Sequence, residues 1–148
     1  MGPSFRHLPS YLKKTGYKNP TQFSDGPFQD AHKIQVPFFG WLGENPEYLE
    51  AFNRYMGGYR KGKASWMDPD LFPVDKLYLG ARPEDVLLVD VGGGLGHDLE
   101  ELNAKYPKLP GRLILQDRPE VIKQVQKASK AIESMEHDFL KEQPIKGR

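Results

Sequence analysis

The stretch VDVGGGLGH (residues 89–97) decides how the second half of the chain folds. It places Gly92, Gly93, Gly94 and Gly96 directly behind a run of aliphatic residues. Glycine gives a core no side chain and costs about 0.5 to 1 kcal/mol relative to alanine in regular structure. A backbone left bare at these positions therefore indicates a turn that a ligand approaches closely.

Short aliphatic runs alternate with amphipathic stretches around this turn. The runs VLLVDV (86–91) and RLILQD (112–117) have the composition of buried strands, and AIESMEHDF (131–139) would form a weaker third strand. Apolar residues recur at helical spacing after the glycines and again after Pro119. Strands that alternate with helices of this length predict right-handed crossovers and a parallel sheet covered on both faces.

The first half of the chain is richer in loop-forming residues. The segment KNPTQFSDGPFQDAH (18–32) has no sustained period and is interpreted as an irregular connection. Asn45 then precedes a proline and apolar residues at three- and four-residue steps, which predicts a helix over about 46–61. Trp66 and Met67 follow, either as core residues or as a wall of the substrate site.

Composition excludes several classes of function. The 148 residues include no cysteine, which removes disulfides, thiolate zinc sites and a cysteine nucleophile, and which fits a cytoplasmic location. The 21 Lys and Arg nearly balance the 20 Asp and Glu, so no field steers the chain toward nucleic acid or a membrane surface. No apolar run has membrane-spanning length, and no histidine pair has the spacing of metal ligands. We expect no metal, nucleic acid or membrane partner.

The glycine turn differs from the common phosphate-binding motifs. The third glycine of a G-x-G-x-x-G fingerprint would fall on His97, and no Lys-Ser or Lys-Thr pair completes a P-loop. Asp117, however, stands 21 residues after Gly96, where an acidic residue at the tip of a second strand accepts hydrogen bonds from ribose hydroxyls. The pattern favours a nucleoside whose tail is not a pyrophosphate.

S-adenosylmethionine meets this description. Its sulfonium and amino-acid tail would lie at the glycine turn, and its ribose would be held by Asp117. Asp138 and Phe139, near the end of the third strand, would contact adenine: the carboxylate would accept from the amino group and the ring would lie on the base. Asp117 as a helix N-cap, and Asp138 as the cap of a turn, remain structural alternatives.

Three motifs carry a family resemblance: LLVDVGGGLGHDLEEL (87–102), LILQDRPEVI (113–122) and MEHDFLKEQPIKG (135–147). Together they resemble the fungal small-molecule O-methyltransferases, relatives of the plant caffeic-acid type, which methylate phenolic and polyketide hydroxyls with S-adenosylmethionine. Residues 19–32 and 38–68 are similar to the segment that precedes the methyltransferase core. The resemblance covers nearly the whole chain.

The resemblance implies an α/β fold: a partial Rossmann-like methyltransferase fold, preceded by a loop-rich and helical segment. Residues 1–80 would be a leader that contributes to the acceptor side or to packing between domains, and 81–148 would be the N-terminal half of the cofactor-binding domain. By the same resemblance, Asp90 and the glycines of 92–96 would form the floor under the methionine end of the cofactor. Asp90 as a cap of the loop is the structural alternative.

The family has two parts that this sequence does not match. One is an N-terminal dimerisation region of winged-helix type, and the other is a C-terminal half with the histidine that deprotonates the acceptor. None of the four histidines matches that position, so we expect no catalytic residue here and a general base beyond Arg148. The run 86–91 would lack a neighbouring strand, so we expect self-association or a full-length relative that completes the sheet. A natural truncation, an incomplete gene model and a split enzyme all fit.

Three functions are weighed against one another. The leading one is an S-adenosylmethionine-dependent O-methyltransferase whose acceptor is a small hydroxylated aromatic or polyketide-type metabolite. The alternative is a catalytically inactive remnant that acts as a cofactor-binding or protein-interaction module. A nicotinamide-dependent oxidoreductase fits less well, because His97 replaces the third glycine and no hydride-transfer residues stand out.

Overall fold

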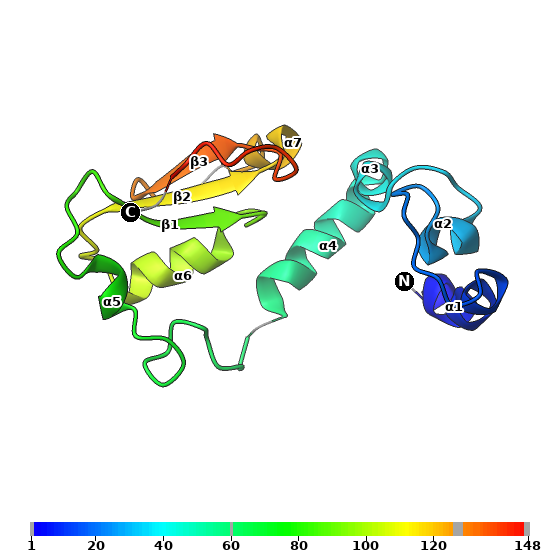
Figure 1. Ribbon diagram of the computed structural model, residues 1–148, viewed down its shortest axis with the longest axis horizontal. Helices are drawn as coiled ribbons and strands as arrows, with labels where there is room; N and C mark the ends of the chain where they lie inside the picture. Colours follow the sequence, from blue (N-terminus) through cyan, green and yellow to red (C-terminus); the bar gives the residue numbers. More distant parts are fainter. Residues whose placement is uncertain (1, 60, 126–128, 147–148) are drawn as a thin grey trace. The chain divides into compact units, whose positions relative to one another are not determined.

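A three-stranded parallel sheet forms the second half of the chain in the computed structural model, which describes residues 2–59, 61–125 and 129–146 (Figure 1). Its strands are β1 (Val86–Val91), β2 (Arg112–Asp117) and β3 (Ile132–Glu136), in the order β1-β2-β3. The first two strands have the predicted bounds. The third is confirmed as a strand but ends at Glu136, before the residues expected to contact adenine.

Helix α6 (His97–Lys105) follows β1 and lies along one side of the sheet (Figure 1). Two further helices in this half are short: α5 (Asp75–Tyr78) and α7 (Pro119–Ile122). The hydrophobic core joins α6 to the sheet and to the segment that precedes β1. Its buried residues are Met67, Val74, Leu99, Leu102, Leu113, Leu115 and Ile132. Full burial of each such side chain stabilises the fold by about 1.5 to 3 kcal/mol.

The segment after β3 covers part of the opposite face of β2. Side chains alternate along a strand, so Gln116 points away from the core that holds Leu115. Its fully buried amide exchanges two hydrogen bonds with the amide of Gln143, at 2.9 and 2.8 Å. A buried amide is stable only when its donors and acceptors are paired, so this reciprocal pair fixes the segment against the sheet.

Strand β1 has an open edge, as predicted. Within the described residues it pairs only with β2. Residues 86–90 of β1 are half-buried and Val91 is 46% exposed, whereas residues 113–116 of β2 are at most 2% exposed. An aliphatic strand this exposed is typical of a sheet that continues beyond the strand on its open side.

The first half of the chain is more helical than its sequence indicates. It contains α1 (Gly2–Lys14), α2 (Pro27–His32), α3 (Phe38–Glu44) and α4 (Pro46–Gly58). Helix α4 confirms the helix predicted from residue 46 and ends a few residues early, at the two glycines. Helix α1 was not predicted from the sequence. None of the helices in the described residues is long and apolar enough to cross a membrane.

The interpretation of residues 18–32 as an irregular connection is wrong for its last six residues, which form α2. Pro27 has no N–H to leave unpaired at the first helical position. The Gln29 side chain accepts from the Gly26 N–H at 3.1 Å, which pairs a backbone donor at the start of the helix. Asn45 is the N-cap residue of α4, but its side chain makes no cap hydrogen bond to that helix; its amide donates to the Trp41 carbonyl of α3 at 2.7 Å.

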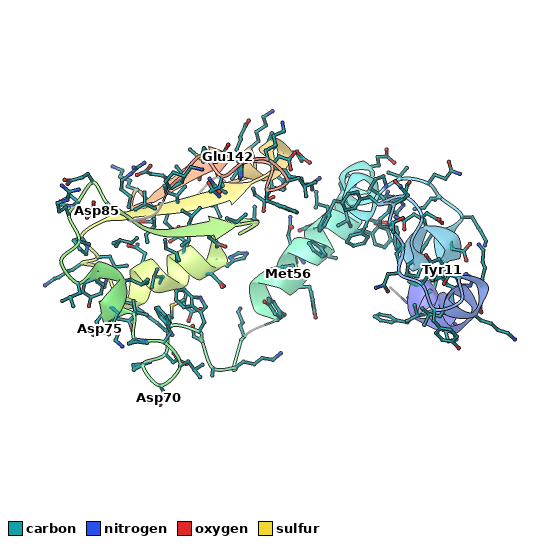
Figure 2. The ribbon with its side chains drawn as sticks, in the orientation of Figure 1. Tyr11, Met56, Asp70, Asp75, Asp85 and Glu142 are labelled. Atoms are coloured by element: carbon teal, nitrogen blue, oxygen red, sulfur yellow. The ribbon has the colours of Figure 1, made fainter. Side chains whose placement is uncertain are left out.

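The chain divides into two units, Met1–Tyr59 and Arg60–Arg148. Met67 and Val74 lie in the core of the sheet, and the Tyr106 hydroxyl donates to the Met67 carbonyl at 3.2 Å. The segment before β1 therefore belongs to the same unit as the glycine turn. In the other unit, Tyr11 is buried and donates to the Asp25 carbonyl at 3.0 Å (Figure 2).

Candidate functional site

The glycine loop, residues 92–96, connects the carboxyl end of β1 to the first turn of α6. Gly92, Gly94 and Gly96 have φ angles of +74°, +62° and +83°. Side chains with a Cβ rarely adopt these left-handed values, so three of the four glycines are required by the path of the backbone.

Gly93 is required for a different reason, which is crowding. A Cβ built on Gly93 would lie 2.6 Å from Cδ1 of Leu115, and closer still to the carboxylate of Asp90. A side chain here would force the loop away from the sheet. Together, the positive φ angles and this close approach make a tight turn at the carboxyl end of β1, of the kind that lets a ligand approach the backbone closely.

Asp117, at the end of β2, lies against the same loop. Its Oδ2 accepts a hydrogen bond from the Gly94 N–H at 2.8 Å, and its Oδ1 accepts from the Arg118 N–H at 2.7 Å. The N-cap residue of α7 is Arg118, so the alternative of Asp117 as the N-cap is wrong. A carboxylate has about four lone-pair sites, which leaves acceptor capacity for hydroxyl groups of a ligand.

Asp90 adds a second carboxylate at the loop. It lines a hollow of about 230 Å³ whose other walls are Trp66, Leu88, Val89, Asp98 and Leu99. Burial raises the pKa of Asp90, and the negative charges of Asp98 and Asp117 raise it further. The raised pKa reflects first the burial of the carboxylate and then the neighbouring negative charges, and a positively charged group beside Asp90 would favour its ionised form.

Asp138 and Phe139 lie beyond β3 and are exposed. The Asp138 carboxylate accepts from the Leu140 N–H at 3.1 Å, as in the alternative in which it caps a turn. The His137 N–H donates to the Asp117 carbonyl at 2.9 Å, which connects this segment to the end of β2. Phe139 is 65% exposed, so its ring has a free surface.

The structure separates the two residues considered for a substrate wall. Trp66 lines the hollow beside Asp90. Met67 has no exposed surface and belongs to the core. Met67 therefore fits the core interpretation, and Trp66 borders the hollow. Asp90, Asp117 and the glycines lie close together at one edge of the sheet.

Several curated relatives of the chain are fungal proteins, and no family model matches the chain. O-methyltransferase mpaG' of Penicillium brevicompactum is 48% identical over 149 residues, which cover 97% of this chain and 37% of the relative. Demethylsterigmatocystin 6-O-methyltransferase of Aspergillus flavus is 39% identical, over 97% of this chain and 36% of the relative. The chain is homologous to part of the fungal O-methyltransferases. It spans little more than a third of their length.

Solved structures share the fold. OxaC in complex with sinefungin and meleagrin is 29% identical with a TM-score of 0.75, over 97% of this chain and 36% of that one. LepI in complex with S-adenosylmethionine is 34% identical with a TM-score of 0.72, over 98% of this chain and 37% of that one. These comparisons confirm the predicted fold class, a part of the Rossmann-like methyltransferase fold.

Three contributors to the site were missed in the sequence. Asp98 follows the last glycine by two positions and lines the hollow, and its charge acts on Asp90. Leu115 and Gln116 precede Asp117 and contact the loop from β2. The only signal in the sequence was the alternation of side chains in the predicted strand, which placed Leu115 and Asp117 on one face but named no contact.

Proposed function

We propose that the chain is the S-adenosylmethionine-binding portion of an O-methyltransferase whose acceptor is a hydroxyl of an aromatic or polyketide-type metabolite. The observation that carries the proposal is the 2.8 Å hydrogen bond between the Gly94 N–H and the Asp117 carboxylate. It unites the two features, a bare loop and an acidic strand tip, that nucleoside binding requires. The names of the fungal relatives support methyl transfer to oxygen.

The residues present fit this cofactor. The space beside Gly92 and Gly94 is open for the methionine end, Asp90 places a carboxylate at the loop, and Asp117 has lone pairs for the ribose hydroxyls. Asp138 and the exposed ring of Phe139 would contact adenine. When bound, S-adenosylmethionine supplies an electrophilic methyl group on a sulfonium.

The chain's own contribution would be binding and orientation. A methyl group held in line with a nucleophile gains much of its reactivity from position alone. A phenolic hydroxyl also needs a base within hydrogen-bond reach, and the proposal places that base outside residues 1–148. Trp66, at the hollow, is the proposed contact with the acceptor side.

A second candidate is a cofactor-binding or interaction module without catalysis of its own, and the open edge of β1 favours it. A strand edge with unpaired backbone groups is a template for another strand. We propose that this edge binds a strand of a second copy or of a full-length relative. One structural relative, 34% identical, is named "A Pericyclic Reaction enzyme", so cofactor binding and methyl transfer need separate assays.

A matched pair of glycine variants tests the binding proposal. Gly94 and Gly16 both have φ of +62° with no atom within 4 Å of a Cβ, but Gly16 lies in the other unit, far along the chain from the loop. Gly94→Val should abolish binding of S-adenosylmethionine in a calorimetric titration, and Gly16→Val should leave the dissociation constant unchanged. Equal affinities for the two variants would contradict the site.

A further inference from the structure

The last residues of β2 contact nearly every glycine of the loop. The Gln116 carbonyl accepts from the N–H of Gly92 at 2.7 Å and from that of Gly93 at 3.3 Å. The Asp117 carboxylate accepts from the N–H of Gly94. Hydrogen bonds to β2 therefore hold three successive residues of the loop. The side chain that precedes Gln116 in β2 has a separate role.

That side chain is Leu115, which is fully buried. Its two δ-methyl groups occupy the space beneath the loop: a Cβ on Gly93 would lie 2.6 Å from Cδ1, and one on Gly96 would lie 3.1 Å from Cδ2. Leu115 thus fills the gap between the sheet and both ends of the turn that presents the Gly94 N–H. Protein interiors are close-packed, so removing those methyl groups leaves the backbone above them without support.

We propose that Leu115 is a positioning residue for the cofactor loop, acting through its two δ-methyl groups on Gly93 and Gly96. Because Leu115 is fully buried, its side chain would act through the loop and not on a ligand directly. Its effect on the ligand rests on the proposed function, but its effect on the loop does not. The loop amides must stay in place for the Asp117 carboxylate to be held at Gly94, and Leu115 restricts the path of the backbone on both sides of that bond.

Leu113 offers a matched control. It lies on the same strand and face as Leu115, belongs to the same core and is 2% exposed, but it sits two residues further from the loop. Valine has no δ-methyl groups and suits a strand, so Leu115→Val removes the atoms beneath the loop and keeps bulk at the strand. Leu113→Val makes the same chemical change elsewhere in the core. Leu115→Met keeps an atom at one of the two δ positions, so its loop should be held better than in Leu115→Val and less well than in the wild type.

The first readout is amide hydrogen exchange by NMR in the free chain, with thermal unfolding measured for each variant. Leu115→Val should lower the protection of the Gly92, Gly93 and Gly94 amides by about tenfold relative to Leu113→Val, the factor that corresponds to about 1.4 kcal/mol. Equal protection in the two variants would overturn the proposal. So would loop amides that are unprotected in the wild type, because there would then be no held loop.

The second readout is affinity for S-adenosylmethionine. Leu115→Val should bind it about tenfold more weakly than Leu113→Val does, and Leu115→Met should have an affinity between those of Leu115→Val and the wild type. A purely structural role would lower thermal stability in both valine variants and leave their affinities equal, which would overturn the proposal. If the wild type bound no cofactor, the proposed function would fail, while hydrogen exchange would still decide the role of Leu115.

Discussion

Replacing Asp117 with asparagine should weaken the binding of S-adenosylmethionine nearly as much as replacing it with alanine. Its two oxygens each accept from a different backbone donor, Gly94 N–H at 2.8 Å and Arg118 N–H at 2.7 Å. Asparagine has a single oxygen, so its NH₂ group would face one of those two donors. The substitution therefore disturbs the loop as well as the proposed ribose contact.

The expected magnitude follows from the hydrogen bonds that are lost. A hydrogen bond to a charged group contributes about 1.5 to 3 kcal/mol, so losing the ribose contact should weaken S-adenosylmethionine binding about 10- to 150-fold. Calorimetric titration should give Asp117→Asn and Asp117→Ala dissociation constants within about threefold of each other. Asp70→Asn, an exposed carboxylate in another turn, is the control for net charge (Figure 2).

A ligand without the ribose diol completes the test of Asp117. The 2′,3′-dideoxy form of S-adenosylhomocysteine should bind the wild type weakly and should lose little further affinity in Asp117→Ala, since the contact removed by the mutation is already absent. An Asp117→Asn variant that binds S-adenosylmethionine like the wild type would refute the reasoning. So would an equal loss of affinity for both ligands.

Three further predictions concern charge and the sheet edge. Burial and neighbouring negative charges raise the pKa of Asp90 in the folded chain, so ionisation of this carboxyl group should lower the stability of the fold as the pH rises through that pKa. Asp90→Asn should therefore raise the Tm at pH 7 and flatten the dependence of the Tm on pH. The pKa of Asp30 is lowered from 3.8 to about 2, first by its hydrogen bond with His7. The helical circular-dichroism signal of the first unit should therefore weaken as the pH falls from 4 to 2. Asp30→Asn should remove that transition. Val91→Lys, at the open edge of β1, should reduce self-association in sedimentation experiments, whereas Leu79→Lys, which is 80% exposed outside the sheet, should not. An unchanged pH profile in either aspartate variant, or equal association in both lysine variants, would count against these assignments.

The sequence predicts the sheet well, because its strands are short aliphatic runs with sharp boundaries. Glycines follow VLLVDV directly. RLILQD ends in Asp117, and a proline follows two positions later, so both strands have the expected bounds. The meeting of Asp117 with the glycine loop was also predictable, because the carboxyl ends of neighbouring parallel strands lie at one edge of a sheet.

The remaining features depend on tertiary contacts that no local pattern encodes. Met67 lies in an irregular segment without periodicity, and only the packing of α6 on the sheet shows that it is core. Helix α2 is held by the Gln29 side chain at the Gly26 N–H, a contact that composition cannot reveal. The support of the loop by Leu115 depends on a separation of a few ångströms between β2 and a turn more than 15 residues earlier.

The central claim is that VDVGGGLGH and Asp117 form a cofactor site within these 148 residues. Its most direct test is a calorimetric titration of the purified chain, shown by circular dichroism to be folded, with S-adenosylmethionine. We predict saturable binding with one site per chain. A folded chain that takes up no S-adenosylmethionine would contradict the claim, and would leave the interaction module as the function to pursue.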